Sequence, residues 1–172
     1  LLKKPYVGCG VLASSVGMDK VYTKVIFEKA GLNQAKYEYV RKYNEKYIYM
    51  DSKFNEQVMT LDGVVEKIFK NLKFPMFIKP SNSGSSVGIN KAKSKEELKQ
   101  AIEYASKFDN KILIEEGIIG REVECAVLGN EEITASCVGE VKSAEEFYSY
   151  DAKYNNEESK TEIPANISEE LS

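Results

Sequence analysis

One segment of this chain combines residue types that suit the binding of an anion. Lys79 ends the apolar run 74–78, and the loop 81–88 that follows it contains serine, asparagine, two glycines and one valine. Backbone with short side chains can curve around an anion and direct several N–H groups at it. A lysine adds positive charge for the same oxygens, and one with apolar neighbours needs an anionic partner. We therefore predict a phosphate-binding loop in a β-hairpin; a plain flexible hairpin loop is the alternative.

Two common phosphate-binding motifs do not account for this loop. The P-loop places its lysine after the second glycine and continues at once into a helix. Here Lys79 precedes both glycines, and residues 87–89 are predicted to continue as a strand. The dinucleotide fingerprint requires the G-x-G-x-x-G spacing, which Gly84 and Gly88 lack. The predicted phosphate site therefore depends on Lys79 and the small residues alone.

Three further groups are candidates, each with a plainer structural explanation. Lys20 stands at a predicted helix start, where the helix dipole disfavours a cation, so it is either a ligand-binding residue or a solvated surface lysine. Glu115 and Glu116 close an apolar strand before the turn 117–122, which could meet a base and its ribose or be a solvated charged turn. The aromatic-rich segment 147–154 is predicted to be either a lid or a packed surface loop.

Composition excludes several classes of function. The 172 residues are 42% hydrophobic and 30% charged, as in ordinary globular proteins, and are enough for one domain or two small lobes. A net charge of -3 without a basic run argues against a nucleic-acid partner, and no apolar run reaches the roughly 18 residues that a membrane span needs. The three cysteines lack metal-ligand spacing, which favours a reduced, cytoplasmic protein. With no histidine, chemistry must use lysines, carboxylates, hydroxyls and amides, which suit phosphoryl transfer.

Periodicity and turn signals predict the elements that position these groups. Helices are predicted over 18–30, 64–72 and 95–107. Gly31 suits the position after the first helix, and Ser94 with Glu97 forms a capping box before the third. Strands are predicted over 37–43, 47–50, 76–80, 86–90 and 111–116, and a second hairpin joins 122–128 to 132–141 across Gly129-Asn130. The chain opens without methionine and ends at Ser172, soon after Ser168 and Glu169 begin what looks like a first helical turn, so we expect a piece of a longer protein.

Taken together, these motifs resemble those of the D-alanine–D-alanine ligases, members of the ATP-grasp superfamily. The segments that carry the resemblance, in order, are 6–10, 18–20, 78–88, 114–116, 120–122 and 150–154. The resemblance implies an α+β fold with a mixed, mostly antiparallel sheet. It implies a linker over 1–17, the small ATP-grasp lobe over 18–116, and an incomplete start of the large lobe, with the lid loop, over 117–172.

The resemblance also implies roles for single residues. Lys20 and Lys79 would hold ATP phosphates, and the loop Ser81–Gly88 would close over them. The loop positions implied in nucleotide binding are Ser83, Gly84, Ser85 and Ser86. Ser85 would also act in catalysis, by hydrogen-bonding toward the first D-alanine and to Tyr154.

The remaining implied contacts lie after the loop. Glu115, Glu116 and the backbone near Ile118 would bind the adenine, and Glu122 the ribose. Lys153 would add charge near the γ-phosphate. Tyr154 would close the lid near the second D-alanine, and a tyrosine there fits an amino-acid acceptor better than a hydroxy acid.

The implied reaction joins two D-alanines through an acyl phosphate, with ATP and Mg²⁺ or Mn²⁺, for peptidoglycan synthesis. The family's substrate-orienting glutamate, its oxyanion-stabilising arginine and its metal ligands fall outside this chain, so we expect the chain alone to be inactive and its parent to be a homodimer. Two alternatives remain open. One is an ATP-grasp enzyme with another substrate, such as D-serine at the second position, a biotin carboxylase or a peptide ligase. The other is a nucleotide- or partner-binding module without turnover.

Overall fold

The computed structural model describes residues 4–50, 55–142 and 160–168. The chain divides after Gly117 into two compact units. No helix in the described ranges combines the length and apolar character that crossing a membrane requires.

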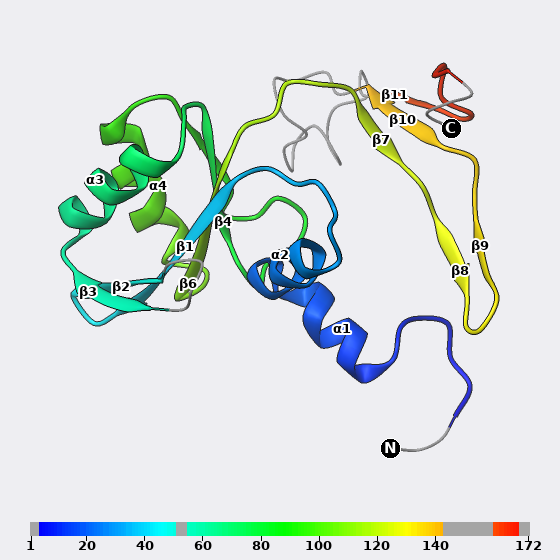
Figure 1. Ribbon diagram of the computed structural model, residues 1–172, viewed down its shortest axis with the longest axis horizontal. Coiled ribbons are helices and arrows are strands. Elements are labelled where there is room, and N and C mark those ends of the chain that lie inside the picture. The colour runs from blue at the N-terminus through cyan, green and yellow to red at the C-terminus, as the bar shows by residue number, and fades with distance from the viewer. Residues whose placement is uncertain (1–3, 51–54, 143–159, 169–172) are drawn as a thin grey trace. The chain divides into compact units, whose positions relative to one another are not determined.

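The first unit is a six-stranded sheet with helices on both faces (Figure 1). Its helices are α1 (Val11–Met18), α2 (Lys20–Lys29), α3 (Leu61–Asn71) and α4 (Lys95–Ala105). Its strands are β1 (Tyr37–Tyr43), β2 (Lys46–Met50), β3 (Glu56–Met59), β4 (Met76–Pro80), β5 (Asn90–Ala92) and β6 (Lys111–Glu116). They lie in the order β3-β2-β1-β6-β4-β5, and every pairing between them is antiparallel.

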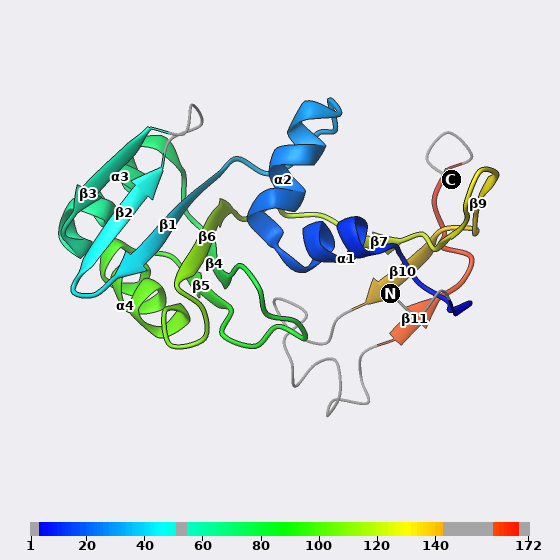
Figure 2. The ribbon, with the colours of Figure 1, turned by 90° about the horizontal axis from the view of Figure 1, so that it is seen from below.

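The hydrophobic core lies between this sheet and the helices α3 and α4, while α2 covers part of the opposite face (Figures 1 and 2). On β6, Ile112 and Ile114 are fully buried in the core. Because side chains alternate along a strand, Lys111, Leu113 and Glu115 point to the α2 face. On β6, Ile112 and Ile114 therefore belong to the core, whereas the α2 face carries the charged Lys111 and Glu115 on either side of the buried Leu113.

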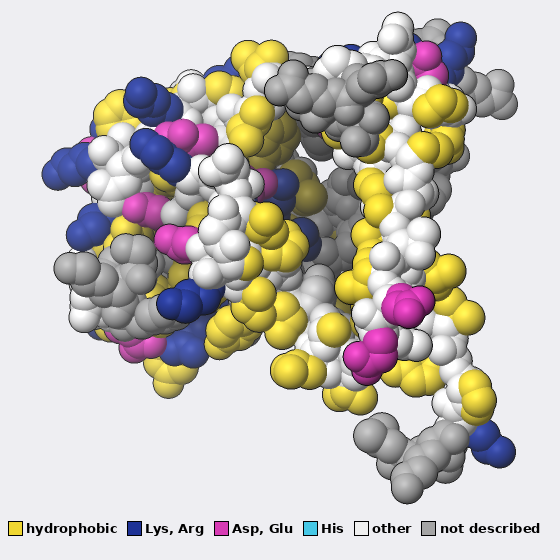
Figure 3. All heavy atoms as spheres, turned by 45° about the vertical axis from the view of Figure 1, so that its right-hand side comes forward, with side chains coloured by type: hydrophobic (Ala, Val, Ile, Leu, Met, Phe, Trp, Pro, Cys, Tyr) yellow, Lys and Arg dark blue, Asp and Glu magenta, His cyan; other side chains and the backbone are white. Residues whose placement is uncertain are grey.

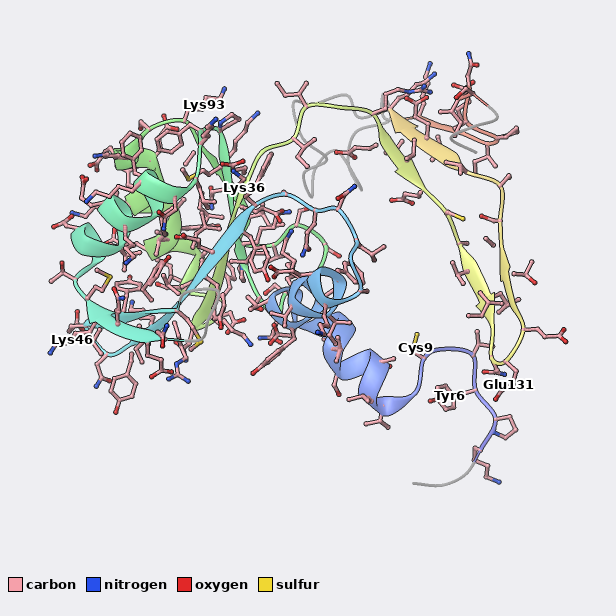
Figure 4. The ribbon with its side chains drawn as sticks, viewed as in Figure 1. Tyr6, Cys9, Lys36, Lys46, Lys93 and Glu131 are labelled. Carbon is pink, nitrogen blue, oxygen red and sulfur yellow. The ribbon has the colours of Figure 1, made fainter. Side chains whose placement is uncertain are left out.

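Most predicted elements of the first unit are confirmed. Strands 37–43, 76–80 and 111–116 have the predicted bounds, and α4 begins at Lys95. The Ser94 hydroxyl accepts from the Glu97 N–H at 3.2 Å, and the Glu97 carboxylate accepts from the N–H of Lys93 at 2.7 Å, just before α4 (Figure 4). The first bond satisfies an N–H group that the first helical turn leaves without an intrahelical partner, and the second ties the residue before the N-cap to the same turn. Both bonds use the two residues of the capping pattern that located this helix.

Other predictions are wrong in informative ways. The helix predicted over 18–30 begins instead at Lys20, because Asp19 is the N-cap of α2; Gly31 follows it with φ +75°. The strand predicted over 86–90 is wrong, since only Asn90 belongs to a strand. The helix α1 and the strand β3 were absent from the prediction; α1 buries none of its residues, so no core-facing pattern marks it. In the segment before α1, the Tyr6 hydroxyl donates to the carbonyl of Cys9 at 3.0 Å (Figure 4).

The second unit contains short strands. They are β7 (Glu122–Glu124), β8 (Val127–Gly129), β9 (Ile133–Ala135), β10 (Gly139–Lys142) and β11 (Lys160–Glu162). The predicted hairpin across Gly129 is confirmed, although it is interrupted on both sides. Gly129 has φ +142°, and a Cβ there would lie 1.9 Å from the carbonyl oxygen of Glu132, so the turn requires glycine. Apolar side chains of this hairpin are exposed on the surface (Figure 3).

Candidate functional site

The α2 face of the first unit gathers six charged side chains from distant parts of the chain. They are Asp19, Lys20, Lys24, Lys79, Lys111 and Glu115. Four cations face two carboxylates, so the cluster carries net positive charge at neutral pH. Such a surface favours the binding of an anion.

Glu115 connects two of these lysines. Its carboxylate forms an ion pair with Lys79 and a second one, at 2.8 Å, with Lys24, whose side chain is 14% exposed. Burial alone would raise the pKa of Glu115, but the charges and hydrogen bonds of Lys79 and Lys24 hold that pKa below its usual value. The anionic partner that the sequence predicts for Lys79 is thus present in the protein itself, and Glu115 fixes the ammonium group near the loop.

Lys20 lies at the start of the glycine-containing loop. Its ammonium group donates to the carbonyl of Pro80 at 3.1 Å and to the carbonyl of Ser83. Burial, together with the nearby charge of Lys79, lowers the pKa of Lys20. Lowered pKa and neutral carbonyl acceptors both indicate a cation that an added anion would stabilise. The structure therefore brings Lys20, Lys79 and the loop together, as the sequence analysis predicts.

The loop is a series of tight turns where the sequence analysis expects a strand. Ser85 and Ser86 have φ of +50° and +60°, and Gly88 has φ +74°. The Val87 N–H donates to the carbonyl of Gly84 at 3.0 Å, and in the next turn the Ile89 N–H donates to the carbonyl of Ser86 at 3.2 Å. A run of residues in turn and left-handed conformations curves the backbone, and such curvature can direct neighbouring N–H groups at one anion. The segment is therefore a turn and not the predicted strand, but its backbone N–H groups can still converge on an anion as the prediction requires.

Of the two glycines in the loop, Gly88 is the one that has no room for a side chain. A Cβ at Gly88 would lie 2.7 Å from both Pro80 and Phe108, at a φ that side chains disfavour, whereas a Cβ at Gly84 would have no atom within 4 Å. We expect Gly88→Ala to lower the free energy of unfolding by about 1–3 kcal/mol, through overpacking and backbone strain. Gly84→Ala should change it by about 0.5 kcal/mol or less. Urea unfolding of both variants tests this, and equal effects would contradict the packing role of Gly88.

The other predicted residues lie at the end of β6 and beyond it. The Glu116 carboxylate accepts from the N–H of Lys73 at 2.8 Å, and the Glu116 N–H donates at 2.9 Å to the carbonyl of Lys36, which precedes β1 (Figure 4). Ile118 is 73% exposed, and Glu122 is exposed at the start of β7; both belong to the second unit.

In that unit, Arg121 donates two hydrogen bonds, at 2.6 and 2.7 Å, to the buried carboxylate of Glu140. This bidentate pair links the turn before Glu122 to the neighbouring strand β10. Lys153, Tyr154 and the rest of the predicted lid lie outside the described residues. Within residues 4–50, 55–142 and 160–168, no three acidic, cysteine or histidine side chains are grouped as a metal ion would require.

Sequence reasoning missed Asp19, Lys24 and Lys111 as members of the site. Lys24 follows Lys20 by four residues, a spacing that places both on one face of a helix. Lys111 lies four residues before Glu115, a spacing that places both on one face of a strand. Those two periodicities, applied to the charged residues as well as to the apolar ones, would have found Lys24 and Lys111.

The ion pairs of Glu115 predict how stability changes with acidity. Because the pKa of Glu115 is lower in the folded protein than in the unfolded chain, its contribution is complete above the unfolded pKa, near 4.5, and is lost as the pH falls through the folded value. We expect the protein to be more stable than its Glu115→Gln variant at about pH 6, and the difference to shrink steadily toward about pH 3. Urea unfolding across this range tests it; a difference that does not depend on pH would contradict the ionised pair.

Comparison with solved structures identifies the class of protein that has this fold. The chain superimposes on the VanG D-Ala:D-Ser ligase of Enterococcus faecalis with a TM-score of 0.77 and 36% identity, over 96% of this chain and 44% of that one. It also matches the D-alanyl-alanine synthetase A of Vibrio cholerae, with a TM-score of 0.73 and 27% identity over 98% and 47% of the two chains. The fold is the α+β fold of the ATP-grasp ligases, as the sequence analysis predicts.

Sequence comparison narrows this class to a family. Residues 26–172 match the family model described as the D-ala D-ala ligase C-terminus. The chain is 56% identical over 166 residues to a D-alanine–D-alanine ligase of Acetivibrio thermocellus, covering 96% of this chain and 41% of that protein. It is 49% identical to that of Geobacillus thermodenitrificans, covering 99% and 43%. The chain belongs to the D-alanine–D-alanine ligase family, and it spans less than half the length of these relatives.

Proposed function

We propose that this chain supplies the phosphate-binding part of an ATP-dependent ligase that joins two D-alanines. The observation that carries the proposal is the meeting of Lys20, Lys79 and the turns of loop 81–88 on one face of the sheet. Two ammonium groups and a curved run of backbone suit a chain of phosphates. Lys20 in particular is a partly buried cation whose ammonium group donates to the neutral carbonyls of Pro80 and Ser83, so an anionic group fits beside it.

In this proposal the residues of the chain bind and orient ATP. Lys20 and Lys79 hold its phosphates. Glu115 lies beside the adenine and keeps Lys79 in place through their ion pair. The backbone of the loop closes over the phosphates, through Ser83, Gly84, Ser85 and Ser86. Ser85 additionally orients the first D-alanine.

The roles of the later residues complete the proposal. The backbone at Glu116 and Ile118 contacts the adenine, and Glu122 the ribose; Lys153 and Tyr154 act from the lid. Bound ATP supplies the phosphoryl group that activates a carboxylate, with Mg²⁺ or Mn²⁺ held by residues other than those described here. We further propose a cytoplasmic, homodimeric ligase. The family relationship supports each of these assignments.

A second candidate is a ligase that joins D-alanine to D-serine. The observation that favours it is the 36% identity and TM-score of 0.77 to a protein described as a D-Ala:D-Ser ligase. The 56% identity to a D-alanine–D-alanine ligase makes D-alanine the first choice for both positions.

A chimaeric enzyme tests the proposal. This chain would replace the matching 41% of the Acetivibrio thermocellus relative, and phosphate release and dipeptide formation would be measured with D-alanine, D-serine and L-alanine. We expect D-alanyl-D-alanine from the chimaera and no turnover by the chain alone. A D-alanyl-D-serine product from the mixture would select the second candidate. A folded chimaera that releases no phosphate with any of these amino acids would contradict both, and would favour a binding module without turnover.

A further inference from the structure

A buried polar network lies beneath the phosphate-binding loop. The Asp19 side chain is the N-cap of α2 and accepts from the N–H groups of Val21 and Tyr22, each at 3.1 Å. The same carboxylate accepts from the Ser81 hydroxyl at 2.7 Å and forms an ion pair with Lys111. Asp19 is 7% exposed and Ser81 is fully buried. One carboxylate therefore joins a helix start, a loop start and a strand start.

Backbone hydrogen bonds connect the same three segments. The Lys20 N–H donates to the Ser81 carbonyl at 3.0 Å, and the Ser81 N–H donates to the Lys111 carbonyl at 2.8 Å. Lys20 is the residue that follows Asp19, so any movement of Asp19 relative to Ser81 also moves Lys20 relative to the loop. The Lys111 ammonium additionally lies 4.3 Å from the ring centroid of Tyr22, on the first turn of α2.

Both ends of the loop are fixed, and its middle is exposed. At one end, the backbone N–H and the side-chain amide of Asn82 both donate to Asp109, each at 2.8 Å. At the other, Gly88 packs against Pro80 and Phe108. The arc between these ends holds the turns proposed to bind phosphate. The hydrogen bonds at Ser81 thus set the position of this part of the loop relative to Lys20.

We propose that Asp19, held by Lys111 and Ser81, is a positioning residue for phosphate binding, which sets the loop and the Lys20 ammonium at the spacing that a phosphate chain requires. The inference rests on the proposed function of the loop. Asp19 acts through other groups, because one of its oxygens accepts from Val21, Tyr22 and Ser81 while the other pairs with Lys111.

The charge of Asp19 is part of this role. Burial opposes ionisation, but the hydrogen bonds from Lys111, Ser81 and the Tyr22 N–H outweigh it and keep the pKa of Asp19 below its usual value of 3.8. Asparagine at this position retains an oxygen that can cap α2 but loses the charge that holds Lys111. Asp19→Asn therefore separates positioning from simple loss of the helix cap.

The first arm of the test measures the affinity for ATP and for adenosine by calorimetry. It uses the full chain, under conditions in which every variant is folded. We expect Asp19→Asn to weaken ATP binding about ten-fold and to leave adenosine binding nearly unchanged, because only ATP uses the loop. Lys111→Met should act in the same way, whereas Lys111→Arg, which keeps the charge, should retain most of the affinity. Asp62→Asn, which removes a carboxylate paired with Lys99 on the exposed surface, is the matched control and should change neither.

Amide hydrogen exchange on the same proteins forms the second arm, and it needs no nucleotide. Asp19→Asn should accelerate exchange at the Lys20 and Ser81 amides about ten-fold or more while leaving the core strand β6 protected. Ser81→Ala, which keeps the carboxylate and the cap, is the milder variant should Asp19→Asn fail to fold. Unchanged exchange at these amides, or equal weakening of ATP and adenosine, overturns the inference. If the unaltered chain binds no ATP, the proposed function of the loop fails while the exchange arm still decides whether Asp19 positions it.

Discussion

Lys79→Met is expected to weaken ATP binding by about ten- to a hundred-fold, or roughly 1.5–3 kcal/mol. The substitution keeps the apolar stem of the side chain and removes the ammonium group. It also leaves the Glu115 carboxylate with Lys24 as its remaining ion-pair partner among the described residues, so that negative charge would stand near the incoming phosphates. Both changes act in the same direction. Calorimetric titration of the chain with ATP measures the effect directly.

Two further variants make this result interpretable. Lys99→Met also breaks a lysine–carboxylate pair, with Asp62, but on the exposed surface, and it should leave ATP affinity unchanged. Glu115→Gln combined with Lys79→Met should recover part of the lost affinity, because the uncompensated carboxylate is then gone. Unchanged affinity in Lys79→Met would remove this lysine from the phosphate site.

Of the substitutions proposed for this chain, Ile114→Ala is expected to lower the free energy of unfolding most, by about 3–4 kcal/mol. Ile114 is fully buried at the centre of β6, which pairs with β1 on one side and β4 on the other. Truncation would leave a cavity between the sheet and its helices, bounded by strands that cannot close around it. The unfolding free energy in urea, with an unchanged dependence on urea concentration, measures the loss.

An exposed strand residue provides the comparison for Ile114. Val58 lies on the edge strand β3 and is 64% exposed, so Val58→Ala should cost about 0.5 kcal/mol or less. A loss at Ile114 no larger than the loss at Val58 would show that β6 is not the centre of the core. Such a result would also remove the rigid support of Lys111 and Glu115.

Local sequence signals predict many of the helices and strands that position the site. The strand 111–116 and the helix from Lys95 follow from an apolar run and a capping box, which depend on neighbouring residues only. The meeting of Lys79 with the serine- and glycine-containing loop is likewise local. These features were predictable because the residues that determine them are adjacent in the sequence.

The partners of the charged groups were not predictable in the same way. Lys24 and Glu115 are separated by 91 positions, and their pairing depends on how α2 lies against the sheet. The left-handed conformations of Ser85 and Ser86 also escaped prediction, since serine disfavours positive φ and a pattern of small residues does not say where a turn will fall. Asp19 could have been recognised as a helix cap, but its bonds to Ser81 and Lys111 depend on the tertiary fold.

The sharpest test of phosphate binding by the loop is a nuclear magnetic resonance titration of the ¹⁵N-labelled chain with ATP, with adenosine as the comparison. If the loop binds the phosphates, ATP should shift the amide signals of Lys20 and of residues 83–88 more than those of α3 on the opposite face, and adenosine should leave the loop signals in place. Loop signals that move no further than those of α3, at ATP concentrations that saturate binding elsewhere on the chain, would contradict phosphate binding by the loop.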